Sequence, residues 1–220
     1  MSKQQIVKLT KSLLSPHIYY HDKVLGLYVG IGNSSDIIET SLPCAYDEFI
    51  SIIDGGINIQ NDQTHKMKTV TKGNSFIIPH SYPYQCLPQH DFKKYFVIYK
   101  PRLTTDSSLP LIKKHVIAID KDSPPPWRKT SDGFAKKMQY QSHNQKFTAG
   151  VWQGNDFKTG IINFPYNEFI LIKQGCLVCT DEQEEVHKIS VGEALFVPQG
   201  VSCAWQVQGK VSLHFVQIKS

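Results

Sequence analysis

Residues 46–55 read YDEFISIIDG, and residues 166–175 read YNEFILIKQG. The two phrases share a tyrosine, a glutamate, a phenylalanine and a closing glycine, at an offset of 120 residues (166 minus 46). Further along, KGNSFIIPH (from Lys72) lies over VGEALFVPQG (from Val191) at an offset of 119, so one residue has been lost or gained in a loop. Two segments of roughly 70 residues thus run in parallel, which indicates an internal duplication.

Each copy consists of short apolar runs separated by turn residues. Runs such as FISII and YFVIY in the first copy, and FILI and ALFVP in the second, are typical of strands. Only LTKSLLS, at residues 9–15, hints at a helix. Many short strands without alternating helices predict an antiparallel sandwich or barrel. We place the domains at 1–107 and 108–220, because a Ser/Thr/Pro-rich connector with one short strand (115–119) separates the copies.

Composition and charge exclude several classes of protein. The net charge is +5, but the lysines are spread along the chain rather than gathered between stacking aromatics, so we expect no nucleic-acid partner. No window approaches the roughly 20 apolar residues of a spanning helix, and no signal-peptide pattern is present. Five cysteines make an odd count, which fits a reducing compartment. We therefore expect a cytoplasmic protein with no membrane partner.

The second copy, 150–220, resembles the cupin superfamily, whose members are small jelly-roll β-barrels. In the cupin pattern a glutamate is followed after six residues by a glycine, and a Gly-x5-Pro-x-Gly motif comes later. The matching residues are Glu168, Gly175, Gly192, Pro198 and Gly200. With the duplication, the whole chain is similar to a bicupin, and the resemblance implies an all-β fold of two tandem cupin jelly-roll barrels.

The sequence motifs of the second copy are similar to those of cupin domains such as the ones in ureidoglycine aminohydrolase. Trp152, the FPYNEF stretch at 164–169 and Trp205 carry this likeness. It implies a small, polar, nitrogen-containing ligand or substrate.

The cupin resemblance also implies a divalent metal held by three histidines and the glutamate, and here the histidines are missing. In the second copy the His-x-His positions fall on Ile162 and Phe164, or on Ile161 and Asn163, and the later position is Cys203. In the first copy they fall on Leu42 and Cys44, or on Ser41 and Pro43, and the later position is Tyr84. Because a single carboxylate rarely holds a metal against water, we expect neither the usual metal nor another cofactor; a divalent ion on other ligands remains an alternative.

The two glutamates are the first candidates for a functional site. On a strand, Glu168 shares a face with Ile170 and Ile172, so we expect its carboxyl to face the barrel interior. A carboxyl group there acts as a general acid or base, anchors a polar ligand, or is a structural acid satisfied by a neighbouring amide or hydroxyl. Glu48 has the same alternatives in the first copy and ranks second.

Three further residues complete the candidate ligand site with Glu168. Trp205 offers a stacking surface, and Cys203 is either a soft ligand, a nucleophile or a small buried hydrophobe. His214 shares a face with Ser212 and Val216, and reaches the pocket of the second barrel or is a satisfied core histidine.

Three functions remain open on these residues. The first is a protein that binds a small polar metabolite in the C-terminal barrel without the cupin metal. The second is an enzyme, either metal-dependent through Glu168, Cys203 and His214, or a metal-free isomerase, lyase or hydrolase that uses Glu168 in proton transfer. The third is a structural pseudo-dimer with no ligand. In each case we expect a monomeric bicupin or a homodimer.

Overall fold

The structure is a computed structural model that describes residues 5–9, 17–36, 44–89, 91–100, 115–122, 127–129 and 134–220. These residues form strands, turns and one 3-10 turn, η1 (Ser34–Asp36), so the all-β prediction is confirmed. Every strand pair among them is antiparallel. None of the described elements is a helix long and apolar enough to cross a membrane. The proposed boundary at 107/108 and most of the helix-like stretch at 9–15 lie outside the described residues.

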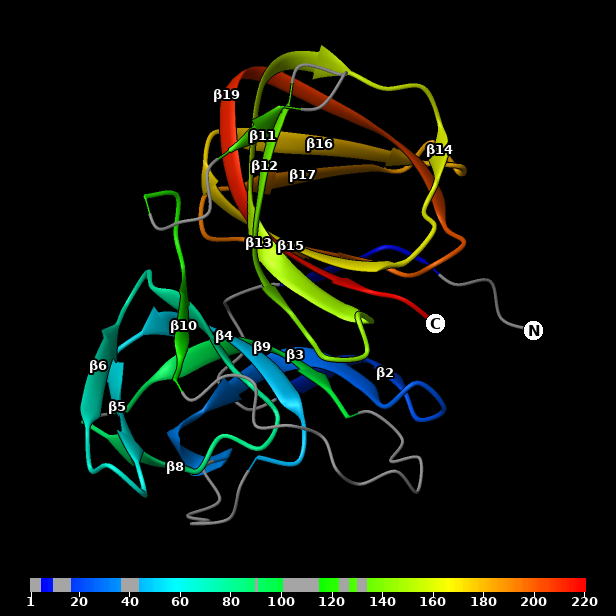
Figure 1. The fold of residues 1–220 in the computed structure, drawn as a ribbon. Coiled ribbons are helices and arrows are strands. Elements are labelled where there is room, and N and C mark those ends of the chain that lie inside the picture. Colours follow the sequence, from blue (N-terminus) through cyan, green and yellow to red (C-terminus); the bar gives the residue numbers. More distant parts are fainter. Residues whose placement is uncertain are drawn as a thin grey trace. The chain divides into compact units, whose positions relative to one another are not determined.

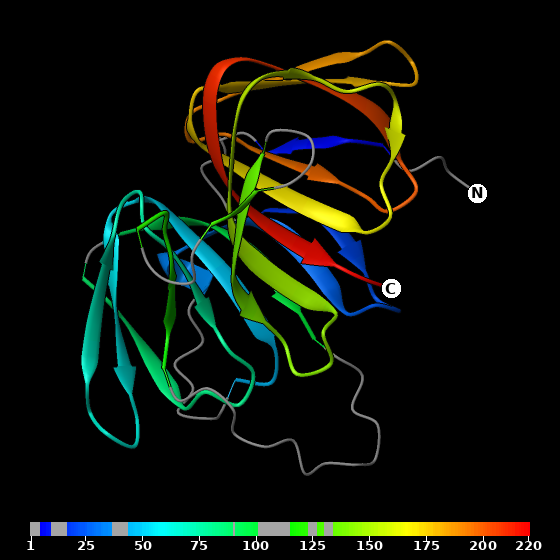
Figure 2. The same cartoon turned by 45° about the horizontal axis from the view of Figure 1, so that its top comes forward.

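The chain divides into two compact units. The first, the N-terminal barrel, contains nine strands among the described residues: β2 (His17–Asp22), β3 (Leu27–Asn33), β4 (Asp47–Asp54), β5 (Gly56–Asn61), β6 (Met67–Thr71), β7 (Ser75–Ile78), β8 (Tyr84–Pro88), β9 (Lys93–Tyr99) and β10 (Ile117–Ile119). One sheet has the order β10-β7-β4-β9-β3-β2 and the other the order β6-β5-β8. Within this unit the smaller sheet curves opposite the larger one (Figures 1 and 2).

The second unit, the C-terminal barrel, contains ten strands among the described residues: β1 (Val7–Leu9), β11 (Arg128–Lys129), β12 (Ala135–Gln141), β13 (Phe147–Lys158), β14 (Ile162–Asn163), β15 (Asn167–Gln174), β16 (Cys176–Asp181), β17 (Val186–Ser190), β18 (Ala194–Val197) and β19 (Ser202–Ile218). The main path is β1-β18-β15-β19-β13-β12-β11. The long strand β19 also pairs with β14 and β16, and β16 pairs with β17, which closes the barrel (Figure 1).

Equivalent strands of the two units pair in the same order and register. Glu48 on β4 lies opposite Ile78 of β7 and Ile98 of β9. Glu168 on β15 lies opposite Val197 of β18 and Gln217 of β19. The central strand of each barrel is therefore the phrase that the sequence repeats, with its glutamate at the same register position.

Each barrel receives one edge strand from outside its own repeat. The connector strand β10 pairs with β7 of the N-terminal barrel, and β1 pairs with β18 of the C-terminal barrel. In the division into compact units, β10 belongs with residues 11–119 and 142–145 to the first unit, and β1 belongs with residues 120–141 and 146–220 to the second. The expected domains, 1–107 and 108–220, stay a prediction, because the residues on either side of that boundary lie outside the described part of the chain.

Turn chemistry explains the repeated glycine and the change in offset. Gly55 and Gly175 have φ values of +69° and +76°, and a Cβ on Gly175 would lie 2.1 Å from the carbonyl oxygen of Lys210. The following hairpins differ in length by one residue: β5 and β6 are joined by residues 62–66, and β16 and β17 by residues 182–185. The offset therefore falls from 120 to 119 in this hairpin loop, as a loop insertion or deletion predicts.

Each barrel has its own hydrophobic core. The strand face that carries Glu168 also carries Ile170 and Ile172, which belong to the core cluster of the C-terminal barrel. In the N-terminal barrel, Ile50 and Ile52 share a strand face with Glu48 and belong to the core cluster of that barrel. The expected inward orientation of this face is confirmed, and both glutamates lie at the end of an apolar lining.

Candidate functional site

Glu168 is a buried carboxyl group with one hydrogen bond. Its side chain lies on the inner face of β15, with 8% of the residue exposed. Its Oε1 accepts a hydrogen bond from Nε2 of Gln217, the residue directly opposite on β19, at 2.9 Å. Among the described residues no second donor contacts the carboxyl group. One carboxyl oxygen is thus engaged by a neutral amide, and the other remains able to accept or hold a proton.

Lys136 connects to this carboxyl group through the same amide. Its Nζ donates to Oε1 of Gln217 at 2.8 Å and lies 4.3 Å from the centre of the Phe215 ring. Burial lowers the pKa of Lys136, and the charge of Glu168 partly offsets this. The amide of Gln217 therefore accepts from an ammonium at one end and donates to a carboxyl group at the other.

Burial controls the protonation of Glu168. It raises the pKa of the carboxyl group from about 4.5 to about 7, although the Gln217 hydrogen bond and Lys136 both act in the opposite direction. Burial together with the Glu168 charge also raises the pKa of the neighbouring Tyr166 to about 12. At neutral pH the Glu168 site therefore contains comparable amounts of the acid and the carboxylate, and either form can contact a polar ligand.

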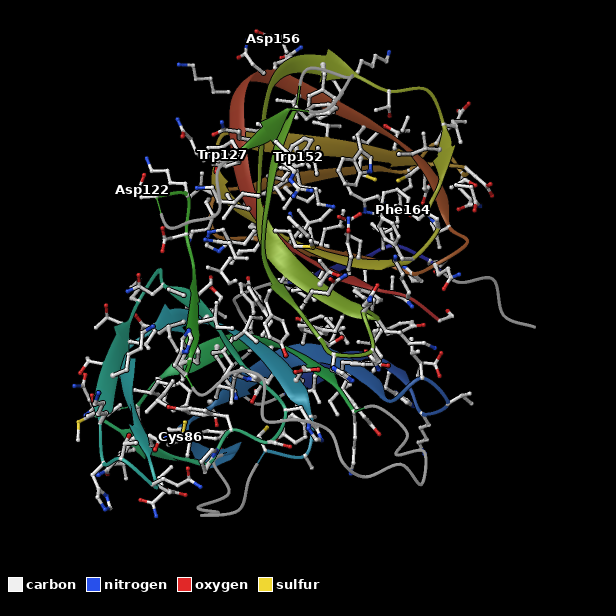
Figure 3. The ribbon with its side chains drawn as sticks, viewed as in Figure 1. Cys86, Asp122, Trp127, Trp152, Asp156 and Phe164 are labelled. Atoms are coloured by element: carbon white, nitrogen blue, oxygen red, sulfur yellow. The ribbon has the colours of Figure 1, made fainter. Side chains whose placement is uncertain are left out.

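A row of aromatic rings runs along one part of the mostly aliphatic interior of the C-terminal barrel. Phe164 lies 5.3 Å from Trp205, measured between ring centroids, and Trp205 lies 6.3 Å from Trp152. Phe134 and Phe157 continue the row beyond Trp152. Trp152 and Phe164, labelled in Figure 3, come from opposite parts of this barrel and both belong to its aromatic lining. The interior of this barrel thus contains flat apolar surfaces as well as the buried carboxyl group of Glu168.

Cys203 belongs to this interior and is hydrogen-bonded to Trp205. The indole Nε1 of Trp205 donates to Sγ of Cys203 at 3.1 Å. Cys179 lies on the neighbouring strand β16, and its thiol lowers the pKa of Cys203 while burial opposes this effect. Cys176 belongs to the opposite face of β16, as the strand periodicity predicts for the two cysteines of the CxxC sequence. Of the expected ligand residues, the structure brings Cys203 and Trp205 into contact with each other.

His214 does not join this set. On β19 it lies opposite Leu171 and Val151, whereas Gln217 lies opposite Glu168, so His214 and Gln217 are on opposite faces of the strand. Burial, followed by the charge of Lys173, lowers the pKa of His214 to about 3, and its Nδ1 has no hydrogen-bond partner among the described residues. The expectation that His214 reaches the pocket of the second barrel is therefore wrong. Both faces of β19 carry apolar residues, so alternation alone does not show which face is the inner one.

The usual cupin metal does not fit the donors that this barrel presents. β14 pairs Ile162 with Cys203, and Phe164 is 3% exposed within the core, so the positions expected for histidines carry aliphatic, aromatic and thiol side chains. The Phe164 ring contributes no ligand atom where an imidazole is expected. Among the described residues one group brings three possible ligand atoms within 4.8 Å of one another, namely Asp181, Glu185 and His187. Neither barrel glutamate belongs to that group.

The N-terminal barrel neutralises its glutamate differently. Nζ of Lys94 lies 2.8 Å from Oε1 of Glu48, and the two side chains are 16% and 4% exposed. Burial and the Glu48 charge raise the pKa values of Tyr84, Tyr46 and Cys44, the last to about 12. The interior of this barrel therefore contains an ion pair surrounded by protonated phenols and a thiol.

Known proteins resemble this chain chiefly in fold. A family model described as an EutQ-like cupin domain matches residues 141–215. A protein of unknown function from Pseudomonas syringae pv. tomato, of the DUF861 family, has a TM-score of 0.79 at 16% identity, covering 98% of this chain and all of the other. A Cupin 2 conserved barrel domain protein from Leptotrichia buccalis has a TM-score of 0.65 at 10% identity, covering 100% and 92%.

More remote enzymes share the same fold. Salicylate 1,2-dioxygenase from Pseudaminobacter salicylatoxidans has a TM-score of 0.60 at 10% identity, with 88% of this chain and 71% of the enzyme covered. No curated protein sequence matches the chain. The predicted fold class, all-β with cupin jelly-roll barrels, is therefore confirmed.

Sequence reasoning missed the partners of Glu168. Gln217 stands in the last strand, opposite the glutamate, and the register of two separated strands is needed to find it. Lys136 comes from β12, upstream of the segments that the repeat aligns. The available signal was the pair of adjacent lysines in the otherwise strand-like run AKKMQYQ. Alternation places one of them on each face of the strand, and does not show which of the two faces the barrel interior.

Proposed function

We propose that this chain binds a small polar molecule at the Glu168 end of the C-terminal barrel, without the usual cupin metal. The observation that carries the proposal is the buried Glu168 carboxyl group, with one hydrogen bond and a pKa of about 7. Carboxyl groups whose pKa is strongly shifted by burial are concentrated at binding and catalytic sites, which supports a functional role for Glu168.

The surroundings of Glu168 support a ligand with one flat and one polar side. Gln217 and Lys136 supply an amide and an ammonium group, and the aromatic row that includes Trp205 supplies a stacking surface. Binding sites of this kind combine apolar walls with a few placed polar groups. Together with the resemblance to ureidoglycine aminohydrolase-like cupins, this favours a small nitrogen-containing metabolite. On the same reasoning we propose that the chain is a duplicated bicupin in which the C-terminal barrel holds the ligand.

A thermal-shift screen against ureides, sugars and amino acids tests the proposal. We expect at least one compound to raise the melting temperature of the wild-type protein, and Glu168→Gln to reduce that shift strongly. Glu48→Gln makes the same change at the equivalent register position of the other barrel and should retain the shift relative to its own melting temperature. The proposal fails if no compound stabilises the protein, or if Glu168→Gln responds as the wild type does.

Metal-free enzymatic activity is the second candidate, and the pKa of Glu168 favours it. General acids and bases work best when their pKa lies near the working pH, as that of Glu168 does. Any compound found in the screen should then be followed by NMR for turnover. A product that forms with the wild type and not with Glu168→Gln supports an enzyme, whereas unchanged ligand supports binding alone.

A further inference from the structure

Three reactive side chains stand in a row in the C-terminal barrel: an amine, a primary amide and a carboxyl group. Nζ of Lys136 lies 2.8 Å from Oε1 of Gln217, and Nε2 of the same glutamine lies 2.9 Å from Oε1 of Glu168. An ammonium group can only donate hydrogen bonds, so the carbonyl oxygen of the amide faces Lys136 and the amide nitrogen faces Glu168. The amide carbonyl is therefore next to an amine, and the amide nitrogen is next to an acid.

The N-terminal barrel shows that a glutamate at this register position does not need an amide between itself and a cation. There Nζ of Lys94 contacts Oε1 of Glu48 directly, at 2.8 Å. The residue opposite Glu48 on β9 is Ile98, where the C-terminal barrel has Gln217 opposite its own glutamate. Neutralisation of a buried charge explains the direct pair, but it does not explain a carboxamide placed between the two charged groups.

The surroundings of the row favour the neutral forms of its two end groups. Nζ of Lys136 lies 4.3 Å from the centre of the Phe215 ring, which belongs to the core cluster of the barrel. Burial lowers the pKa of Lys136 and raises that of Glu168, so both groups are shifted toward the free amine and the protonated acid. A free amine is the nucleophilic form of lysine, and a protonated carboxyl group can deliver a proton to a leaving group.

We infer that Lys136 and Gln217 become joined by an isopeptide bond, and that Glu168 is the acid and base of this reaction. This inference goes beyond the proposed function, since it needs no ligand and concerns a covalent modification of the chain itself. In the cross-linked protein Lys136 no longer supplies an ammonium group. Glu168 keeps its place on β15 and remains available to a polar molecule.

The reaction is the aminolysis of one side-chain amide by another side chain. The lone pair on Nζ of Lys136 forms a bond to Cδ of Gln217, and the bond from Cδ to Nε2 breaks with its electron pair passing to Nε2. Glu168 donates a proton to Nε2, which leaves as ammonia, and regains a proton from Nζ. One amine and one primary amide thus give one secondary amide and one ammonia molecule, without an oxidant or other co-reactant.

The fold supplies both the proximity that the reaction needs and a use for its product. Well-oriented groups within one molecule react as if present at effective concentrations of up to about 10⁵–10⁸ M. The two residues are 81 positions apart in the chain, and β13 lies between their strands β12 and β19. A bond between them ties three strands of the sheet together. It should stabilise the barrel because it restricts the unfolded chain.

Mass spectrometry of the purified full-length chain under denaturing conditions tests the inference. We expect the wild-type mass to be lower than the sequence mass by one ammonia molecule, and a tryptic digest to contain a branched peptide that joins Lys136 to Gln217. Lys136→Arg keeps the positive charge but has no amine, so its mass should match its sequence. Lys137→Arg changes the neighbouring lysine, which lies on the opposite face of β12, and should still lose ammonia.

The role of Glu168 is tested by the rate at which the branched peptide forms. Glu168→Gln should slow its formation about a hundredfold or more, because it removes the acid and base. Far-UV circular dichroism shows whether each variant keeps the strand content of the wild type. The inference is overturned if the wild type keeps its sequence mass after prolonged incubation, if Gln217 is hydrolysed instead of cross-linked, or if Glu168→Gln forms the bond as fast as the wild type.

The outcome is independent of the ligand screen, because no ligand takes part in the mass measurement. A wild-type chain without the branched peptide overturns the cross-link and leaves the Glu168 binding proposal open. A cross-linked chain that no compound stabilises overturns the binding proposal and leaves the cross-link standing.

Discussion

Nζ of Lys94 lies 2.8 Å from Oε1 of Glu48 inside the N-terminal barrel. In the C-terminal barrel the position equivalent to Lys94 is Leu213, opposite Ile172 in the same register. Glu168 consequently faces a neutral amide, with an ammonium group one hydrogen bond further away. The same strand phrase thus carries a paired charge in one barrel and a readily protonated carboxyl group in the other.

Removal of Lys94 should strongly destabilise the N-terminal barrel. Lys94→Met leaves the buried Glu48 carboxylate without its cation, which costs ~3–5 kcal/mol of unfolding free energy for buried pairs. Urea unfolding followed by far-UV circular dichroism measures this change. The double variant Lys94→Met with Glu48→Leu should recover most of the loss, because no charge then remains buried. Equal destabilisation of the single and double variants would contradict this account of the pair.

Stability of the C-terminal barrel should fall as the pH rises through the range where Glu168 titrates. The folded pKa is about 7 and the ordinary value about 4.5, so between these pH values the folded state holds more protons than the unfolded state. From pH 5 to pH 8 this group alone should reduce the unfolding free energy by about 2–3 kcal/mol. Glu168→Gln cannot titrate and should lack this part of the pH dependence.

Tryptophan fluorescence is a suitable signal for that comparison. All three tryptophans of the chain, Trp127, Trp152 and Trp205, belong to the C-terminal unit. Other groups titrate alike in both proteins, so the difference between wild type and Glu168→Gln isolates the glutamate. A variant whose stability changes with pH as much as that of the wild type would show that Glu168 has an ordinary pKa.

Gly175→Ala should destabilise the C-terminal barrel far more than Gly209→Ala. Both glycines have positive φ, at +76° and +72°, so each substitution has a backbone cost of about 1 kcal/mol. At Gly175 the new Cβ would also lie 2.1 Å from the carbonyl oxygen of Lys210, while nothing lies within 4 Å at Gly209. Thermal unfolding of the two variants checks the prediction, and equal losses would mean that backbone conformation alone decides the cost.

Of the five cysteines, Cys176 should react first with a thiol reagent such as DTNB at pH 8. It is partly exposed, whereas Cys179 and Cys203 are fully buried. Burial raises the pKa of Cys86 to about 11, so only on the order of one molecule in a thousand carries its thiolate at pH 8. The fast phase of the reaction should disappear in Cys176→Ser. Its persistence in that variant would show that another thiol is exposed by local opening.

The sequence predicted the features that depend on local alternation and repetition. The shared phrase placed Glu48 and Glu168 on inner faces, because strand side chains alternate and the neighbouring isoleucines need a core. Features that depend on register between distant strands were not predictable in this way. Gln217 and Lys136 meet Glu168 only after β12, β15 and β19 assemble. The sequence left open whether the face of β19 that carries His214 points into the barrel, because β19 is apolar on both sides.

The pairing of β1 with β18 has a consequence for synthesis of the chain. Lys8 lies opposite Leu195, so the partner of this early strand emerges from the ribosome about 187 residues later (195 minus 8). At a translation rate of roughly 5–20 residues per second, on the order of 10–40 s pass before β1 can form its hydrogen bonds with β18. During this interval the strand is available to chaperones or to a wrong sheet edge, so translation speed and chaperone supply should affect the yield of the C-terminal barrel more than that of the N-terminal one.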